Sequence, residues 1–93
     1  MLQTGSVVYS TAGRDKYRFY AVVQLEQGAA LIADGKARKL DRPKRKNILH
    51  LRPTKTVLGA PAMRTDKQLR LALASFNDRE SARSQKEGGL RLV

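Results

Sequence analysis

Closely spaced turn residues constrain this chain more than any other feature of its sequence. Glycines and one Asp-Gly pair interrupt the first half of the chain so often that only short apolar runs remain between them. Short apolar runs bounded by such residues are typical of β-strands. We predict five strands, over residues 7–10, 17–26, 29–33, 37–40 and 48–51. Five short strands with tight turns suit a small, partly closed barrel, in which the sheet hides its edges by curling on itself.

The run over residues 17–26 shows the clearest strand pattern. Because side chains of a strand alternate between its two faces, every second residue belongs to the same face. One face of this run is apolar and comprises Phe19, Ala21, Val23 and Leu25. The other face carries Arg18, Gln24 and Glu26, but Tyr20 and Val22 interrupt it. We therefore expect one buried face and one that is only partly covered.

Two turn signals set the predicted boundaries of the later strands. Asp34-Gly35 lies between two strand-like runs, where Asp-Gly is a strong signal for a two-residue hairpin, so we expect strand 37–40 to pair with strand 29–33. Residues 41–47 are predicted to form a loop, because Pro43 lacks an amide donor and the surrounding charges oppose burial. Arg52-Pro53 is expected to end the fifth strand.

The C-terminal third of the chain has a different character. We divide the chain into a barrel over residues 1–54, a linker over 55–64, a helix over 65–78 and a flexible tail over 79–93. Thr65 followed by Gln68 has the form of a capping box at the start of the helix. An apolar stripe at helical spacing, Leu69, Ala72, Leu73 and Phe76, is expected to pack on the barrel.

Composition excludes several classes of protein. The 93 residues suffice for one domain, and the absence of cysteine excludes a disulfide framework and a thiolate zinc site. No apolar run is long enough to cross a membrane, and the start of the chain lacks the pattern of a secretory signal, so we expect a cytoplasmic protein. The chain has a single histidine and no obvious carboxylate pair, so it offers few residues for general acid–base catalysis. Its glycines do not have the spacing of a phosphate-binding loop. We expect neither an enzyme nor a bound cofactor or metal.

Positive charge is the strongest functional signal. The chain carries 19 basic and 8 acidic residues, a net charge of +11. Seven basic residues crowd into eleven positions, opposed only by Asp41: Lys36, Arg38, Lys39, Arg42, Lys44, Arg45 and Lys46. Such an excess favours a polyanionic partner, with nucleic acid first, an anionic membrane surface second and an acidic protein third. A solvated charged face is the alternative without a partner.

The N-terminal half also resembles a known family. Residues 7–16, Val-Val-Tyr-Ser-Thr-Ala-Gly-Arg-Asp-Lys, followed by the apolar alternation up to Val23, look like a KOW motif. With the Asp-Gly turn, the Pro-Lys-Arg-Lys run and the Asn-x-x-His-Leu string, residues 4–54 resemble KOW-domain RNA-binding proteins related to large-subunit ribosomal proteins of the fourteen-e, six-e and twenty-seven-e group. The resemblance implies an SH3-like barrel whose loops contact structured RNA. It assigns Gly13 as the motif glycine and places Arg14 and Lys16 on the loop that approaches RNA.

Tyr17 departs from the pattern of the family, because many KOW motifs have a second glycine at this point. A tyrosine here offers a ring that could stack on an unpaired base. Packing within the barrel is the other interpretation of the tyrosines, and His50 is either an ordinary strand residue or an occasional phosphate donor. The full set of predicted RNA-binding residues is Gly13, Arg14, Lys16, Tyr17, Lys36, Arg38, Lys39, Arg42, Lys44, Arg45, Lys46 and His50.

The predicted partner is structured RNA, with ribosomal RNA of the large subunit first, bound by a monomer. Lysine and arginine at this density read the backbone and shape of an RNA more than its bases. Two alternatives stay open from the sequence. One is a protein-interaction KOW module that docks through Leu69, Leu73 and Phe76, and the other is general DNA binding.

Overall fold

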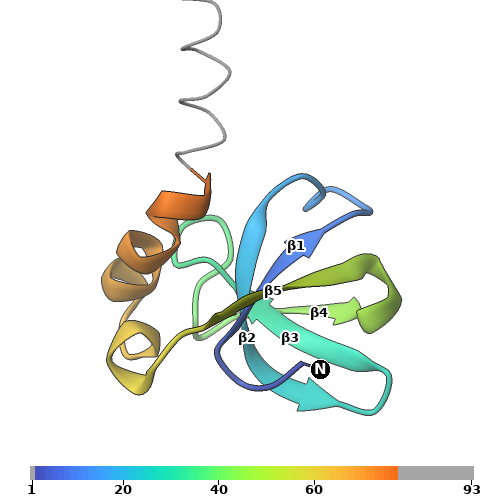
Figure 1. Ribbon diagram of the computed structural model, residues 1–93, viewed down its shortest axis with the longest axis horizontal. Coiled ribbons are helices and arrows are strands. Elements are labelled where there is room, and N and C mark those ends of the chain that lie inside the picture. The colour runs from blue at the N-terminus through green and yellow to red at the C-terminus, as the bar shows by residue number, and fades with distance from the viewer. Residues whose placement is uncertain (1, 78–93) are drawn as a thin grey trace, which may run out of the picture.

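A five-stranded antiparallel sheet and one C-terminal helix make up the fold (Figure 1). The computed structural model describes residues 2–77, so the predicted tail over 79–93 lies outside the described residues. The strands are β1 (Ser6–Ser10), β2 (Phe19–Glu26), β3 (Ala29–Ala33), β4 (Lys44–Asn47) and β5 (Leu51–Val57). Their order in the sheet is β4-β3-β2-β1-β5, so β4 and β5 are its edges. Two short 3-10 helices, η1 (Ile48–His50) and η2 (Ala60–Met63), flank β5.

Both faces of the sheet are buried, each by its own apolar cluster. The inner cluster comprises Val8, Tyr20, Val22, Ala30, Ile32 and Leu51. The helix-side cluster comprises Val7, Ala21, Ala33, Leu69 and Leu73. The register explains this division, because residues paired across antiparallel strands point to the same face: Val8 lies opposite Tyr20, and Val7 lies opposite Ala21. The expectation of a partly covered second face on β2 is confirmed, since Tyr20 and Val22 are buried there whereas Gln24 and Glu26, farther along the strand, are exposed.

The predicted hairpin after Asp34-Gly35 and the strand over 37–40 do not form. Asp34 Oδ1 accepts hydrogen bonds from the backbone amides of Lys36 (2.9 Å) and Arg38 (2.8 Å), and the Asp34 amide donates to the Arg38 carbonyl oxygen (2.9 Å). These bonds fold residues 34–38 into a compact loop, because an aspartate side chain can bond its own neighbouring backbone in place of a sheet partner. We call residues 34–43 the 34–43 loop.

The fourth strand lies where a loop was predicted. Strand β4 pairs with β3, with Lys44 opposite Ile32 and Asn47 opposite Ala29. Pro43 immediately precedes the strand, so its missing amide removes no bond from the ladder. Because β4 is an edge strand, the charged side chains of Lys44 and Arg45 can stay exposed while its backbone pairs on one side.

The fifth strand also differs from its prediction. Residues 48–50 form η1, in which Asn47 Oδ1 accepts a hydrogen bond from the Leu49 amide (2.8 Å). Strand β5 then begins at Leu51 and continues through Pro53 to Val57, three residues into the predicted linker. Proline is tolerated in an edge strand, where one side of the backbone needs no partner. Arg52-Pro53 therefore does not end the strand.

The predicted C-terminal helix is confirmed over residues 66–77. Thr65 Oγ1 accepts a hydrogen bond from the Gln68 amide (3.1 Å), as the capping pattern predicts. Leu69 and Leu73 are buried against the sheet, so the stripe that could have served as a docking face is occupied by the protein's own core. At the far end, Asn77 Oδ1 accepts a hydrogen bond from the Phe19 amide (2.8 Å), and Asn77 Nδ2 donates to the Phe19 carbonyl oxygen (3.1 Å).

Candidate nucleic-acid interface

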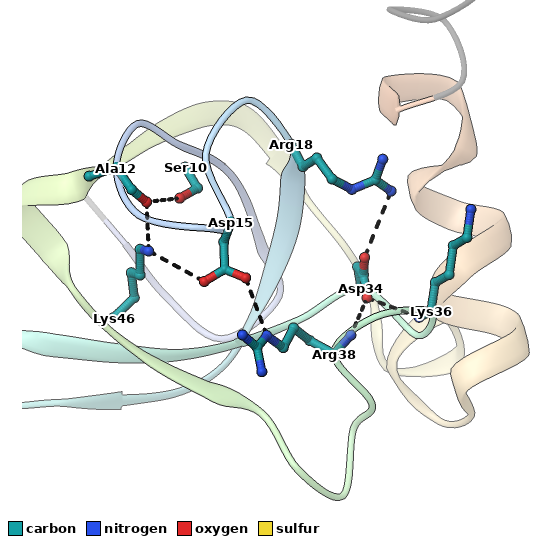
Figure 2. Close-up of polar contacts among 8 residues, drawn as sticks. All are labelled: Ser10, Ala12, Asp15, Arg18, Asp34, Lys36, Arg38 and Lys46. Atoms are coloured by element: carbon teal, nitrogen blue, oxygen red, sulfur yellow. Dashed lines mark hydrogen bonds and ion pairs between the residues drawn. The ribbon is translucent and has the colours of Figure 1, made fainter.

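The loop between β1 and β2 is tied to the edge strand β4 by one lysine (Figure 2). Lys46 Nζ donates to the carbonyl oxygen of Ala12 (2.7 Å) and lies 3.4 Å from Asp15 Oδ2. Gly13 has a φ of +78°, and a Cβ atom there would lie 2.8 Å from Lys46 Nζ. The positive φ at this turn favours glycine, and a side chain at position 13 would also displace the lysine head.

A buried carboxylate joins three segments of the chain. Asp15 Oδ1 accepts a hydrogen bond from Arg38 Nε (3.2 Å), while Oδ2 faces Lys46, and the Asp15 side chain is only 7% exposed. Burial by itself would raise the pKa of Asp15, but the hydrogen bonds and positive charges of Arg38 and Lys46 outweigh it and hold this pKa below its ordinary value of 3.8. The β1–β2 loop, the 34–43 loop and β4 are therefore fixed relative to one another by a charged cluster.

Three of the predicted phosphate-binding cations have partners within the protein. Lys46 is 8% exposed and pairs with Asp15, so it does not belong to the exposed cations of this region. Arg38 shares the same carboxylate, and Arg45 Nε lies 2.8 Å from Glu26 Oε1 at an exposed site. The acids that oppose the basic run therefore come from distant parts of the sequence, whereas Asp41 takes part in no ion pair among residues 2–77.

The other predicted cations are exposed, and all of them except Lys44 of β4 lie on two loops. None of them forms an ion pair within the described part of the chain; they are Arg14, Lys16, Lys36, Lys39, Arg42 and Lys44. The contact between Asp15 and Arg38 brings the two loops together, although Lys36 lies on the side of the helix (Figure 2). His50 is exposed on η1, and its carbonyl oxygen accepts hydrogen bonds from the Thr11 amide (2.9 Å) and hydroxyl (3.1 Å). Apart from Lys46, the predicted residues are at least partly exposed and lie on the β1–β2 loop, the 34–43 loop, β4 and η1.

Tyr17 has an unusual backbone and an exposed ring. Its φ is +70°, in the left-handed region that favours glycine, and it is the one non-glycine residue with positive φ in the described part of the chain. The residue is 66% exposed, Lys16 Nζ lies 5.3 Å from the ring centroid, and the Tyr17 amide donates to the Ser10 carbonyl oxygen (2.8 Å). Tyr17 therefore adopts a backbone conformation usual for glycine, and its ring is exposed to solvent.

Asp15 and Asp34 are the residues of this region that sequence reasoning missed. Each is buried and organises a loop, yet each stands in the sequence as an isolated acid within a basic chain. For Asp34 a signal was present, because Asp at the first position of a turn commonly bonds the backbone amide two residues ahead. For Asp15 no local signal exists, since both partners lie more than twenty positions away.

Comparison with known proteins adds no family to this description. No protein-family model matches the chain, and no curated protein matches it. Among residues 2–77 no group of three His, Cys, Asp or Glu side chains is placed to hold a metal ion. In the same part of the chain no helix is long and apolar enough to cross a membrane.

Proposed function

We propose that the protein is a non-enzymatic RNA-binding module of the SH3-like KOW type, which binds structured RNA, and large-subunit ribosomal RNA in particular, through the β1–β2 and 34–43 loops. One observation carries the proposal. Two loops rich in exposed cations are locked together by the buried carboxylate of Asp15. Fixed charges lose little conformational freedom on binding, and they can match the spacing of successive phosphates.

The number of exposed cations sets the expected salt dependence of RNA binding. Six exposed cations without an internal partner among the described residues are available for phosphates. Neutralising about six phosphates releases their counterions, so affinity falls by roughly three orders of magnitude between about 50 and about 200 mM salt. Arg38 and Lys46 contribute to the local potential but are held by Asp15, so they add little to this salt dependence.

Recognition of RNA rather than of any polyanion rests on shape and on one aromatic side chain. A rigid, loop-built surface fits the folded regions of RNA, where loops and bulges expose unpaired bases. Tyr17 presents its ring at such a surface, flanked by Lys16. Stacking of an unpaired base on this ring would add a contact that duplex DNA does not offer.

Charge reversal at matched positions tests the proposal. The loop variant R14E/K39E/K44E removes three exposed cations of the proposed surface. The control variant K55E/R64E/K67E changes the net charge equally, at exposed positions on β5, before the helix and within it. Lys46 is left unchanged, because its loss would disturb Asp15.

The measurement is fluorescence anisotropy with labelled fragments of large-subunit ribosomal RNA at several salt concentrations. We expect the loop variant to lose roughly 100-fold in affinity at low salt, and the control to lose far less. Duplex DNA at the same salt serves as the competitor. Equal losses for the two variants, or equal affinity for duplex DNA, would contradict a defined RNA-binding surface on these loops.

A further inference from the structure

A small pocket lies between the 34–43 loop and the C-terminal helix. Its volume is about 160 Å³, and its charged lining comprises Arg18, Asp34, Lys36 and Arg70, with Leu71 and Ala74 on the helix side. Small-molecule sites commonly measure about 300–1,000 Å³, so the pocket suits a phosphate-sized group and not a whole cofactor.

Three cations from three different elements converge on this pocket. Arg18 immediately precedes β2, Lys36 lies on the 34–43 loop, and Arg70 belongs to the helix. Within residues 2–77 neither Lys36 nor Arg70 forms an ion pair. The lining holds three positive charges against the single carboxylate of Asp34, so its net charge is positive and favours an anion.

The loop and the helix are held in contact, so the pocket is built into the fold. The Leu40 amide donates to Asp66 Oδ1 (2.7 Å) in the first turn of the helix. Gly35 has a φ of +77°, and a Cβ atom there would collide with the carbonyl oxygen of Asp66. A side chain at position 35 would therefore push the loop away from the helix and open the pocket.

Asp34 forms an ion pair with Arg18 but accepts no hydrogen bond from it. The Asp34 side chain is 1% exposed, and its Oδ1 bonds the amides of the loop. Its Oδ2 has no hydrogen-bond partner among the described residues and lies 3.8 Å from Arg18 Nη2 (Figure 2). Arginine has five N–H donors, and a side chain held by charge at this distance keeps them for another acceptor. The 40% exposure of the Arg18 side chain leaves it within reach of a ligand.

We propose that this pocket binds a backbone phosphate of the RNA, contacted by Arg18, Lys36 and Arg70, with Leu71 and Ala74 against the adjoining sugar. This inference rests on the proposed function and extends the RNA surface from the loops onto the helix. Continuity supports an RNA phosphate over a free phosphate ion, because Lys36 shares its loop with Lys39 and Arg42 of the proposed surface.

The test compares neighbouring charges on the same helix. Arg70→Gln and Lys36→Gln each remove one pocket cation, and Lys67→Gln removes an exposed cation of the helix that does not line the pocket. RNA affinity is measured against salt concentration for each variant. We expect each pocket variant to reduce the slope of log affinity against log salt by about one, and Lys67→Gln to leave it unchanged. All three side chains are exposed, and circular dichroism confirms that the variants remain folded.

A second measurement separates the source of the phosphate. Inorganic phosphate is titrated into the full chain while the backbone amide resonances of Lys36 and Arg70 are followed by NMR. Shifts that Arg70→Gln abolishes, together with the reduced salt slope, support the inference. Shifts without any change in slope mean that the pocket takes free phosphate only, which overturns the assignment to RNA. If wild-type protein binds RNA and the pocket variants match Lys67→Gln, the inference fails and the proposed function stands; no RNA binding by the wild type refutes both.

Discussion

Lys46 Nζ lies 3.4 Å from a carboxylate oxygen of Asp15, across 31 positions of sequence. Both side chains are more than nine-tenths buried, at 9% and 7% exposure. The pair connects the edge strand β4 to the β1–β2 loop, and Arg38 adds the 34–43 loop to the same carboxylate. The loops proposed to meet RNA therefore owe their relative positions to charges that themselves stay inside the protein.

Removing the lysine charge is expected to destabilise the fold. Lys46→Met keeps much of the side-chain volume but leaves Asp15 buried with Arg38 as its one charged partner. Breaking a buried pair from one side is strongly destabilising, so we expect a loss of about 3 kcal/mol in the free energy of unfolding. Urea denaturation measures it, with Lys44→Met, at the exposed end of the same strand, as the control.

A double-mutant cycle isolates the interaction itself. The variant D15N/K46M removes both charges, so its destabilisation should be smaller than the sum of the two single effects, by about 0.5–3 kcal/mol. Strict additivity in the cycle would mean that the two charges do not stabilise each other.

Acid should remove the contribution of Asp15. Its pKa in the folded protein lies below the ordinary value of 3.8, which the unfolded chain retains. The unfolded state then binds the proton more readily, so the stabilisation is fully present above about pH 4 and is lost as pH falls through the lowered pKa. Urea midpoints of wild type and Asp15→Asn should differ at neutral pH and converge below about pH 4. A difference that stays constant through this range would show that the charge of Asp15 is not what stabilises the loops.

Gly13→Ala tests the second reason for a glycine in the β1–β2 loop. A positive φ costs an alanine about 1 kcal/mol, and here the new Cβ also meets Lys46 Nζ. Gly28→Ala is a matched control, because Gly28 has a φ of +73° with nothing within 4 Å of the added atom. We expect Gly13→Ala to destabilise more than Gly28→Ala in urea denaturation, and the excess to vanish when Lys46→Met is also present. An excess that survives the loss of the lysine would place the clash elsewhere.

The sequence predicted the elements whose signals are local. Strands β1 to β3 lie within about two residues of their predicted ranges, and Thr65 caps the helix, because short apolar runs and capping residues act over a few positions. Strands β4 and β5 were predicted at the wrong positions. Both are edge strands, which tolerate the charge of Lys44 and the missing amide of Pro53, and Asp34 bonds the backbone of its own loop where a hairpin was predicted. Whether a strand lies at the edge depends on how the whole sheet assembles, and a local sequence pattern does not indicate it.

Some features of the candidate site could likewise be predicted from the sequence, and others could not. Positive charge and the glycine turn could be predicted from the sequence, because they belong to single residues. The sequence could not predict which cations remain without an ion pair, because the pairs with Asp15 and Glu26 join residues that are far apart in the chain. Lys46 resembled its neighbours Lys44 and Arg45 in sequence. Strand alternation separates Lys46 from Arg45 but not from Lys44, which belongs to the same face, and only the contact with Asp15 shows that Lys46 is the buried one.

Tyr17→Gly should raise stability and lower RNA affinity at once. Glycine relieves a left-handed backbone that costs about 1–2 kcal/mol for other residues, and its own loss of freedom offsets about 0.5–1 kcal/mol, so we expect a net gain of about 0.5–1 kcal/mol. The proposed function places the exposed ring on an unpaired base, and its loss should weaken RNA binding by about 1–3 kcal/mol. Tyr17→Phe retains the stacking surface and is the control for affinity. Stability that rises while affinity stays at the wild-type value would show that position 17 supplies a strained turn and no contact to RNA.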